Sequence, residues 1–333
     1  MLCCHTNSTY SETTMKRIFI KSVAATLLGC ALGLPAWAQS YPHSTVVLVT
    51  HSKAGGGTDV FLREMSKYLT KHMGTQFAIE NVTGSSGAKA IAKLAASPAD
   101  GSIFYGTTPT YIITSLLSKP SKTFEDMDGI INVFSDPQIV YVSASSPYKT
   151  LGEATAAAKK NAMSVKFGVT TPGSLDRQVM EKYKKITGVK SPVITHDGGG
   201  ELLLSVLNGT VDVGIGELQE LSAQLEAGKV RIITTYTEQR LENLPNVMTA
   251  KEQGIDLVVR KFRGLAGPKN TPDNIKQMWK VGIEKTLKDP DFKKWYTAQA
   301  LIPMVMVGKD YDKFLKEFAL DQQDFFKEYK ITK

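Results

Sequence analysis

Four short polar segments contain the residue types best suited to binding or catalysis, and each directly follows an apolar run. The first, 51–59, has three consecutive glycines at 55–57 followed by Thr58. Glycines let the backbone approach a ligand closely, and free N–H groups at a helix start attract anions. The spacing matches neither a Walker loop nor G-x-G-x-x-G. The segment is also compatible with a plain tight turn in which Asp59 caps the helix.

The second and third segments, 106–110 and 170–174, are rich in hydroxyl groups. Either one alone is typical of a turn. Two such segments in different parts of the chain favour a cleft lined by neutral hydrogen-bond donors. Ligands of parallel α/β sheets bind at the loops that open the helices, which is where both segments lie.

The fourth segment, 196–200, reads His-Asp-Gly-Gly-Gly and is similar to the oxyanion loop of esterases. The nucleophile elbow Gly-x-Ser-x-Gly is absent from the sequence. A triad of Ser174, His196 and Asp197 therefore rests on residue types alone. Metal-ligand spacing is also missing among the histidines beyond residue 38, which lie far apart: they are His43, His51, His72 and His196. We predict no catalysis, no metal site and no cofactor.

The overall composition is that of a soluble globular protein. Hydrophobic residues make up 42% and charged residues 22% of the 333 residues, which excludes a disordered chain and a multi-span membrane protein. Lys and Arg total 40 against 32 Asp and Glu, a net charge of +8. The lysines are scattered, whereas nucleic-acid binders gather positive charge on one face. We therefore expect no nucleic-acid partner.

The N-terminus has the parts of a secretory signal peptide. Basic residues at 16–21 precede an apolar run at 23–34 and an Ala-Trp-Ala site at 36–38. We predict a start at Met15, a leader and signal peptide covering residues 1–38, cleavage after Ala38, and a periplasmic location. The alternative is a lipoprotein box at 27–30, which would leave a lipid anchor on Cys30. Because all three cysteines precede residue 38, the mature chain would contain no disulfide.

Beyond residue 44, short β-branched apolar runs alternate with amphipathic helical patterns. The expected strands are 45–50, 102–105, 138–143, 165–169, 193–195, 211–215 and 230–235. Thr150 opens an alanine-rich helix with a capping box, and the tail from Asp273 is nearly all helical. This alternation predicts an α/β fold with mostly parallel sheets flanked by helices.

The length favours two lobes rather than one core. We expect the chain to cross into the second lobe near Tyr141 and to return near Arg263. Lobe 1 would comprise residues 39–140 and 264–333, and lobe 2 residues 141–263.

The ordered set of these segments resembles the substrate-binding proteins of tripartite tricarboxylate transporters, the Bug/TctC family, over essentially the whole mature chain. The matching stretches are 54–59 with Arg63, 80–84 with Gly87, 98–101, 198–200, 208–212, 225–231, Arg240 with 244–247, and 263–268 with 271–272. None of them is diagnostic alone, but their order is specific.

The resemblance implies a two-lobed Venus-flytrap receptor that catalyses nothing. It would capture a small organic carboxylate in the inter-lobe cleft, through backbone amides and hydroxyls, and deliver it to a membrane permease. The ligand-binding positions that the family implies here are Ser52, Gly56, Gly57, Thr58, Thr107, Thr108, Thr171, Gly173, Ser174 and Asp197. Asp59 would organise its loop instead of touching the anion.

Departures from the family pattern leave the ligand open. His51, Asp197 and Arg177 replace residues common in the family, and Glu217 and Arg263 fall where the cleft is expected. Arg263 could pair a ligand carboxylate or simply pair Glu217. A dicarboxylate is our first expectation, followed by a tricarboxylate or an aromatic acid. We expect a monomer that works with permease subunits. A sensory component for a two-component kinase and, less favoured, a secreted Ser/His hydrolase are the alternatives.

Overall fold

The computed structural model describes residue 1, residues 41–259 and residues 261–331. The predicted signal peptide, its cleavage after Ala38 and the alternative anchor at Cys30 lie outside these described residues. Residues 41–333 form one compact unit. Within the described part, no helix combines the length and apolar character needed to cross a bilayer.

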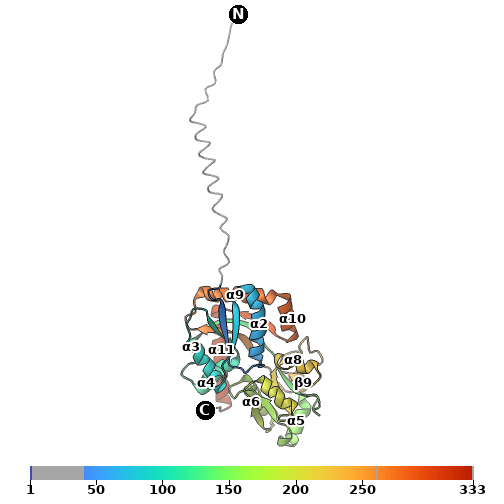
Figure 1. Ribbon diagram of the computed structural model, residues 1–333. Coiled ribbons are helices and arrows are strands. Elements are labelled where there is room, and N and C mark those ends of the chain that lie inside the picture. The colour runs from blue at the N-terminus through green and yellow to red at the C-terminus, as the bar shows by residue number, and fades with distance from the viewer. Residues whose placement is uncertain (2–40, 260, 332–333) are drawn as a thin grey trace. The chain divides into compact units, whose positions relative to one another are not determined.

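The first sheet has six strands in the order β11-β4-β10-β3-β1-β2. Its strands are β1 (Thr45–Thr50), β2 (Gln76–Asn81), β3 (Ile103–Thr107), β4 (Met127–Ser135), β10 (Phe262–Pro268) and β11 (Ile302–Met306). The helices around it are α2 (Gly57–Met73), α3 (Ala88–Ala95), α4 (Pro109–Ser118), α9 (Asp273–Lys288), α10 (Pro290–Ala298) and α11 (Gly308–Glu328). Figure 1 shows α2, α9 and α10 grouped with the strands of this sheet.

The second sheet has five strands in the order β7-β6-β8-β5-β9. Its strands are β5 (Gln138–Ser143), β6 (Phe167–Val169), β7 (Val193–Thr195), β8 (Val213–Glu217) and β9 (Val230–Thr235). Its helices are α5 (Leu151–Lys160), α6 (Leu175–Thr187), α7 (Gly199–Leu207) and α8 (Leu218–Glu226), of which α5, α6 and α8 are labelled in Figure 1.

The α/β class is confirmed, but both sheets are mixed and not mostly parallel as the sequence predicted. β1 pairs in parallel with β2 and β3, whereas β10 is antiparallel to β3 and β4, and β11 to β4. In the second sheet, β6 is parallel to β7 and β8, whereas β5 is antiparallel to β8 and β9. β5 and β10 are the strands that enter each sheet from the other one. They are not reached through a helical crossover, so nothing forces them to be parallel.

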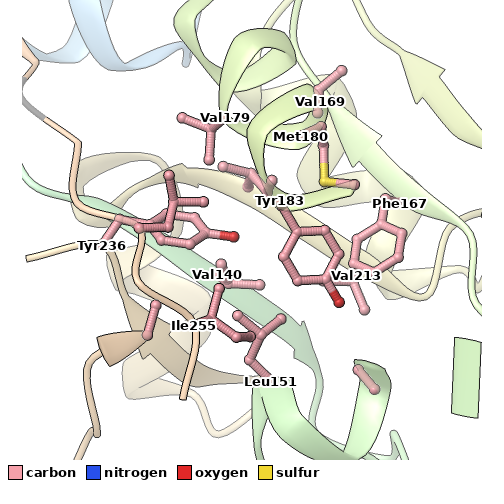
Figure 2. Close-up of a cluster of buried hydrophobic side chains, with 14 of the residues drawn as sticks. Val140, Leu151, Phe167, Val169, Val179, Met180, Tyr183, Val213, Tyr236 and Ile255 are labelled. Carbon is pink, nitrogen blue, oxygen red and sulfur yellow. The ribbon is translucent and has the colours of Figure 1, made fainter. Parts of the chain in front are cut away.

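Each sheet has its own apolar core. Against one face of the second sheet, Val140, Phe167 and Val213 from three strands pack with Tyr183 of α6. Figure 2 shows the Tyr183 ring beside Phe167 and Val213. Trp279 of α9 is fully buried in the corresponding cluster of the first sheet. Trp279 is thus a packing residue of the first sheet's core.

Two connections link the sheets. β4 ends at Ser135 and β5 begins at Gln138, while β9 ends at Thr235 and β10 begins at Phe262. The lobe boundaries predicted from the sequence, 140/141 and 263/264, fall inside β5 and β10. We propose that the boundaries lie in the two connections instead, since a strand hydrogen-bonded throughout one sheet belongs to that sheet.

The helices next to the polar segments begin in ways that their sequences explain. Thr108 caps α4 by accepting the Thr110 N–H at 3.3 Å, and Pro109 occupies the first turn. Ser174 caps α6 by accepting the Arg177 N–H at 3.2 Å. The residues preceding α2 and α7 are Gly56 and Gly198, which have no side chain to cap these helices. The first N–H groups of α2 and α7 are therefore free for other acceptors.

Candidate functional site

The N-terminal turns or preceding loops of five helices surround one small polar cavity. The helices are α2 and α4 of the first sheet and α6, α7 and α8 of the second. Each helix start carries a partial positive charge, so the arrangement favours an anion or another hydrogen-bond acceptor. The cavity measures about 30 Å³, room for roughly one or two water molecules.

Most of the residues predicted to bind ligand line this cavity. They are Ser52, Gly57, Thr58, Thr108, Thr171, Asp197, Glu217 and Arg263. The remaining four are not among its lining residues. Gly56 directly precedes α2, Ser174 caps α6, the hydroxyl oxygens of Thr107 and Tyr311 are 3.1 Å apart, and Gly173 packs against Thr114 and Ser86. The structure therefore brings the first, second, third and fourth polar segments together at one place.

Asp59 holds the glycine loop in place and does not line the cavity. One carboxylate oxygen accepts the Gly55 N–H at 3.0 Å, and the other accepts the Asn81 side-chain amide at 2.9 Å. The Arg63 guanidinium pairs with the same carboxylate at 2.8 Å. Burial raises the pKa of Asp59, but its bonds to Arg63, Gly55 and Asn81 outweigh this and hold the pKa below its usual value. This is the arrangement expected of a residue that organises its loop.

Arg263 lies at the base of the cavity and is paired within the protein. Its side chain is 1% exposed and binds Asp136 through Nε. Its Nη1 donates to the Thr58 hydroxyl at 2.9 Å, and its Nη2 lies 3.3 Å from a Glu217 oxygen. The pair with Glu217, one of the two sequence-based alternatives for Arg263, forms in this structure. Neither sheet supplies this cluster alone.

A second cation, Lys261, completes the buried ion cluster. Its amino group contacts the Glu217 carboxylate and lies 3.8 Å from Asp176. Burial lowers the pKa of Lys261, and the nearby Arg263 charge lowers it further, while Asp176 and Asp136 oppose these effects. The Asp176 carboxylate also accepts from Gln138 and Thr170. Both cations therefore balance acids of the protein.

His51 contributes a neutral ring to the cavity wall. Its Nδ1 is 2.7 Å from the Tyr105 hydroxyl oxygen. Burial, with the charges of Lys261 and Arg263, lowers the pKa of His51 to about 3. The neutral imidazole offers one donor and one acceptor at physiological pH. His51 can thus hydrogen-bond a ligand without adding charge.

Glu220 of α8 extends from the second sheet's side to the start of α2. One carboxyl oxygen accepts the Gly57 N–H at 2.8 Å, and the other accepts the Glu217 N–H at 3.3 Å. Burial raises the pKa of Glu220 to about 8; Asp176 and Asp136 raise it as well, while the Gly57 amide and Arg263 lower it. The free amide at the start of α2 is therefore occupied by an internal carboxyl group.

The residues of the hypothetical hydrolase triad do not form a relay. The His196 Nε2 is 2.9 Å from the Ser205 hydroxyl oxygen, and its Nδ1 is 3.2 Å from the Val169 carbonyl oxygen. Ser174 caps α6, and Asp197 is exposed and pairs with Lys53 at 2.8 Å. A Ser-His-Asp mechanism needs the three side chains in hydrogen-bond sequence, which is not the case here.

Sequence reasoning missed several cavity-lining residues. They are His51, Thr110, Thr170, Gly198, Gly199, Glu220 and Lys261. For Glu220 a signal existed, since Glu217 and Glu220 have the three-residue spacing of a capping box at a helix start. For Lys261 the signal was its alternation with Arg263 at the edge of an apolar strand, which is unusual for two cations.

The fold is that of the periplasmic binding proteins. The structure is similar to the periplasmic binding protein BugD, with a TM-score of 0.82, 20% identity, and coverage of 88% of this chain and 99% of BugD. An R. palustris protein solved with adipate has a TM-score of 0.83 and 24% sequence identity, with coverage of 88% of this chain and 99% of that protein. MatC from Rhodopseudomonas palustris, with bound malate, has a TM-score of 0.74 and 20% sequence identity, with coverage of 87% of this chain and 98% of MatC. The two-lobed fold is thereby confirmed.

The sequence comparisons identify the family within this class. The model of the tripartite tricarboxylate transporter family receptor matches residues 61–330. The chain therefore belongs to this family. It is 27% identical to the UPF0065 protein in the gbd 5′ region of Cupriavidus necator, over 96% of this chain and 99% of that protein. It is 23% identical to protein BugT of Bordetella pertussis, over 82% and 86% respectively.

Proposed function

We propose that this protein captures a small organic carboxylate in the polar cavity and delivers it to a tripartite tricarboxylate transporter permease. The observation that carries the proposal is the convergence of five helix starts on one cavity in a member of this receptor family. The relatives solved with adipate and with malate support a carboxylate, and a dicarboxylate first. The protein would be an exported, periplasmic monomer without cofactor or catalytic activity.

The donors suit a ligand that must later be released. Arg263 and Lys261 already balance acids of the protein, so a ligand carboxylate would use amides and hydroxyls such as those of Gly57, Thr58 and Thr171. Neutral donors bind a carboxylate more weakly than a buried ion pair does. Release to a permease then needs less energy.

The conformation described here is closed. The cavity of about 30 Å³ is far smaller than typical ligand sites of about 300–1,000 Å³. Contacts between elements of the two sheets, Gly57 with Glu220 and Lys53 with Asp197, cover it. Ligand entry therefore requires the sheets to separate, and closure traps the ligand because contacts from both sides are gained.

The test is isothermal titration of protein lacking residues 1–38, refolded to remove co-purified ligand, against mono-, di- and tricarboxylates, aromatic acids and amino acids. We expect at least one acid to bind, dicarboxylates most tightly. Gly57→Ala is expected to abolish binding, because its methyl group would project between Arg263 and Glu217. Gly152→Ala is the matched control, since nothing lies closer than 3.8 Å to its added methyl group.

Two outcomes would contradict the proposal. One is the absence of binding to every acid by natively refolded protein. The other is acid binding that Gly57→Ala and Gly152→Ala affect equally. Uptake of the labelled acid by cells with and without the gene then tests delivery to a permease: the proposal predicts loss of high-affinity uptake in the deletion strain.

A further inference from the structure

The Glu220 carboxyl group lies where two uncapped helices begin. It accepts the first N–H of α2, from Gly57, at 2.8 Å. It also lies against the start of α7, because a β-carbon on Gly199 would overlap the carboxyl group. The helices have 17 and 9 residues, long enough for their terminal dipoles to act on an acceptor. Both glycines leave the space that the carboxyl group fills.

Beside the carboxyl group is a polar side chain without a partner. The Tyr141 hydroxyl, on a residue that is 0% exposed, has no hydrogen-bond partner among the described residues. A β-carbon on Gly216 would lie 2.5 Å from Glu220 Oε2 and 3.6 Å from the Tyr141 ring, so the ring and the carboxyl group share one side of β8. An unpartnered buried hydroxyl is costly. A polar group that enters this side of β8 would supply the missing partner.

The charges around Glu220 explain why it is a replaceable occupant. Asp176 of α6 and Asp136 after β4 disfavour its negative charge, and Arg263 of β10 and the Gly57 amide favour it. The net result, with burial, is a carboxyl group whose pKa is raised to about 8. No cation is paired with Glu220 within 4 Å among the described ion pairs. Glu220 is thus held by two amide donors, unlike the ion-paired Glu217.

We propose that Glu220 is an internal stand-in for the ligand, filling with its own carboxyl group the position between α2 and α7 where a ligand's carboxyl group binds. The inference rests on the proposed carboxylate-binding function. It makes Glu220 a specificity-determining residue: a ligand must displace it from the Gly57 amide, and only acids with enough further contacts do so. Simple monocarboxylates therefore do not bind to wild type.

The test uses acetate, which has the atoms that Glu220→Ala removes, a carbon and a carboxyl group. At pH 6, 100 mM acetate is expected to raise the Tm of Glu220→Ala by about 2 °C relative to 100 mM chloride. The same acetate leaves wild type and Glu220→Gln unchanged, because their own side chain fills the position. Glu226→Ala is the matched control, since Glu226 is an exposed glutamate on the same helix, and acetate leaves its Tm unchanged.

A second measurement does not need the alanine variant to fold. The Gly57 amide resonance of wild type is expected to shift with pH with a midpoint near 8, as its Glu220 acceptor ionises, and Glu220→Gln removes this titration. A Gly57 resonance that does not respond to pH would overturn the inference. The inference would also be overturned if acetate stabilised wild type as much as Glu220→Ala, or if acetate stabilised neither protein.

The inference and the proposed function can fail separately. Acetate rescue of Glu220→Ala, with no acid bound by wild type, would keep the stand-in role and refute the carboxylate receptor. Dicarboxylate binding with the same affinity in wild type and Glu220→Ala would keep the receptor and refute the stand-in. We expect Glu220→Ala to bind dicarboxylates at least tenfold more tightly than wild type.

Discussion

Two carboxyl groups lie at the first turn of α2, and their environments differ sharply. Asp59 faces the glycine loop, where a guanidinium and two amide donors hold it and lower its pKa. Glu220 reaches the same turn from α8, accepts two backbone amides, and has neighbouring acids and burial that raise its pKa. One helix start therefore holds one carboxylate permanently and another weakly.

The difference teaches how a receptor can combine a rigid loop with an exchangeable site. The Asp59 contacts are all made within the first sheet's segments, so they would persist if the sheets separate as proposed. The Glu220 contact with Gly57 joins elements of the two sheets and would be lost on such an opening. Asp59 thus keeps the glycine loop rigid, while Glu220 occupies an amide that a ligand can take over.

The largest expected effect comes from removing the buried Arg263 side chain, which contacts residues of both sheets. Arg263→Met leaves Asp136 and Glu217 buried without it, and we expect a loss of about 3–5 kcal/mol in the free energy of unfolding. Arg240→Met, which breaks the exposed pair with Glu252, is expected to cost less than about 1 kcal/mol. Urea denaturation measures both. Equal losses would mean that the buried cluster has no special weight.

Asp59→Asn tests the carboxylate that holds the glycine loop. We expect a loss of about 2 kcal/mol at pH 7, because charge-assisted bonds to Arg63 and the loop are weakened. Since the folded pKa of Asp59 is lowered, its contribution is present above the unfolded value and is lost as the pH falls through the folded value. The difference from wild type should therefore shrink below about pH 4. Asp273→Asn, in the exposed first turn of α9, is the control and should show no such convergence.

Glu220→Gln tests the carboxyl group that a ligand is proposed to displace. The contribution of Glu220 to stability has the opposite pH dependence to that of Asp59. A raised folded pKa means that wild type loses stability as the pH rises from the unfolded value near 4.5 through about 8. We expect this variant to lack that loss and to gain at least about 1 kcal/mol over wild type at pH 8.5 relative to pH 5. Thermal unfolding across this range measures it. Parallel pH curves for the two proteins would show that Glu220 does not titrate as described.

Features set by neighbours in the sequence were predictable. The Asp59 loop, the cap at Thr150 and strands such as 138–143 follow from local patterns, and the structure contains them. Helix capping and turn chemistry act over a few residues, so one sequence suffices to infer them.

Long-range features were not predictable. Arg263 and Asp136 are 127 positions apart, and nothing in either segment indicates the other. β10 contains two glycines and a proline, which are unusual in a strand, and the sequence analysis expected no strand there. It is a strand because the chain returns from the second sheet between β3 and β4. The mixed pairing and the ion cluster both depend on that return.

The most direct test of the central claim is the response of the Gly57 backbone amide when a dicarboxylate is titrated into refolded protein, followed by 1H–15N correlation spectroscopy. The account predicts that a binding acid replaces Glu220 as the acceptor, so the Gly57 resonance shifts strongly while that of Gly152 stays in place. Binding of an acid that leaves the Gly57 amide unperturbed would contradict the account, because the ligand would then occupy some other part of the protein.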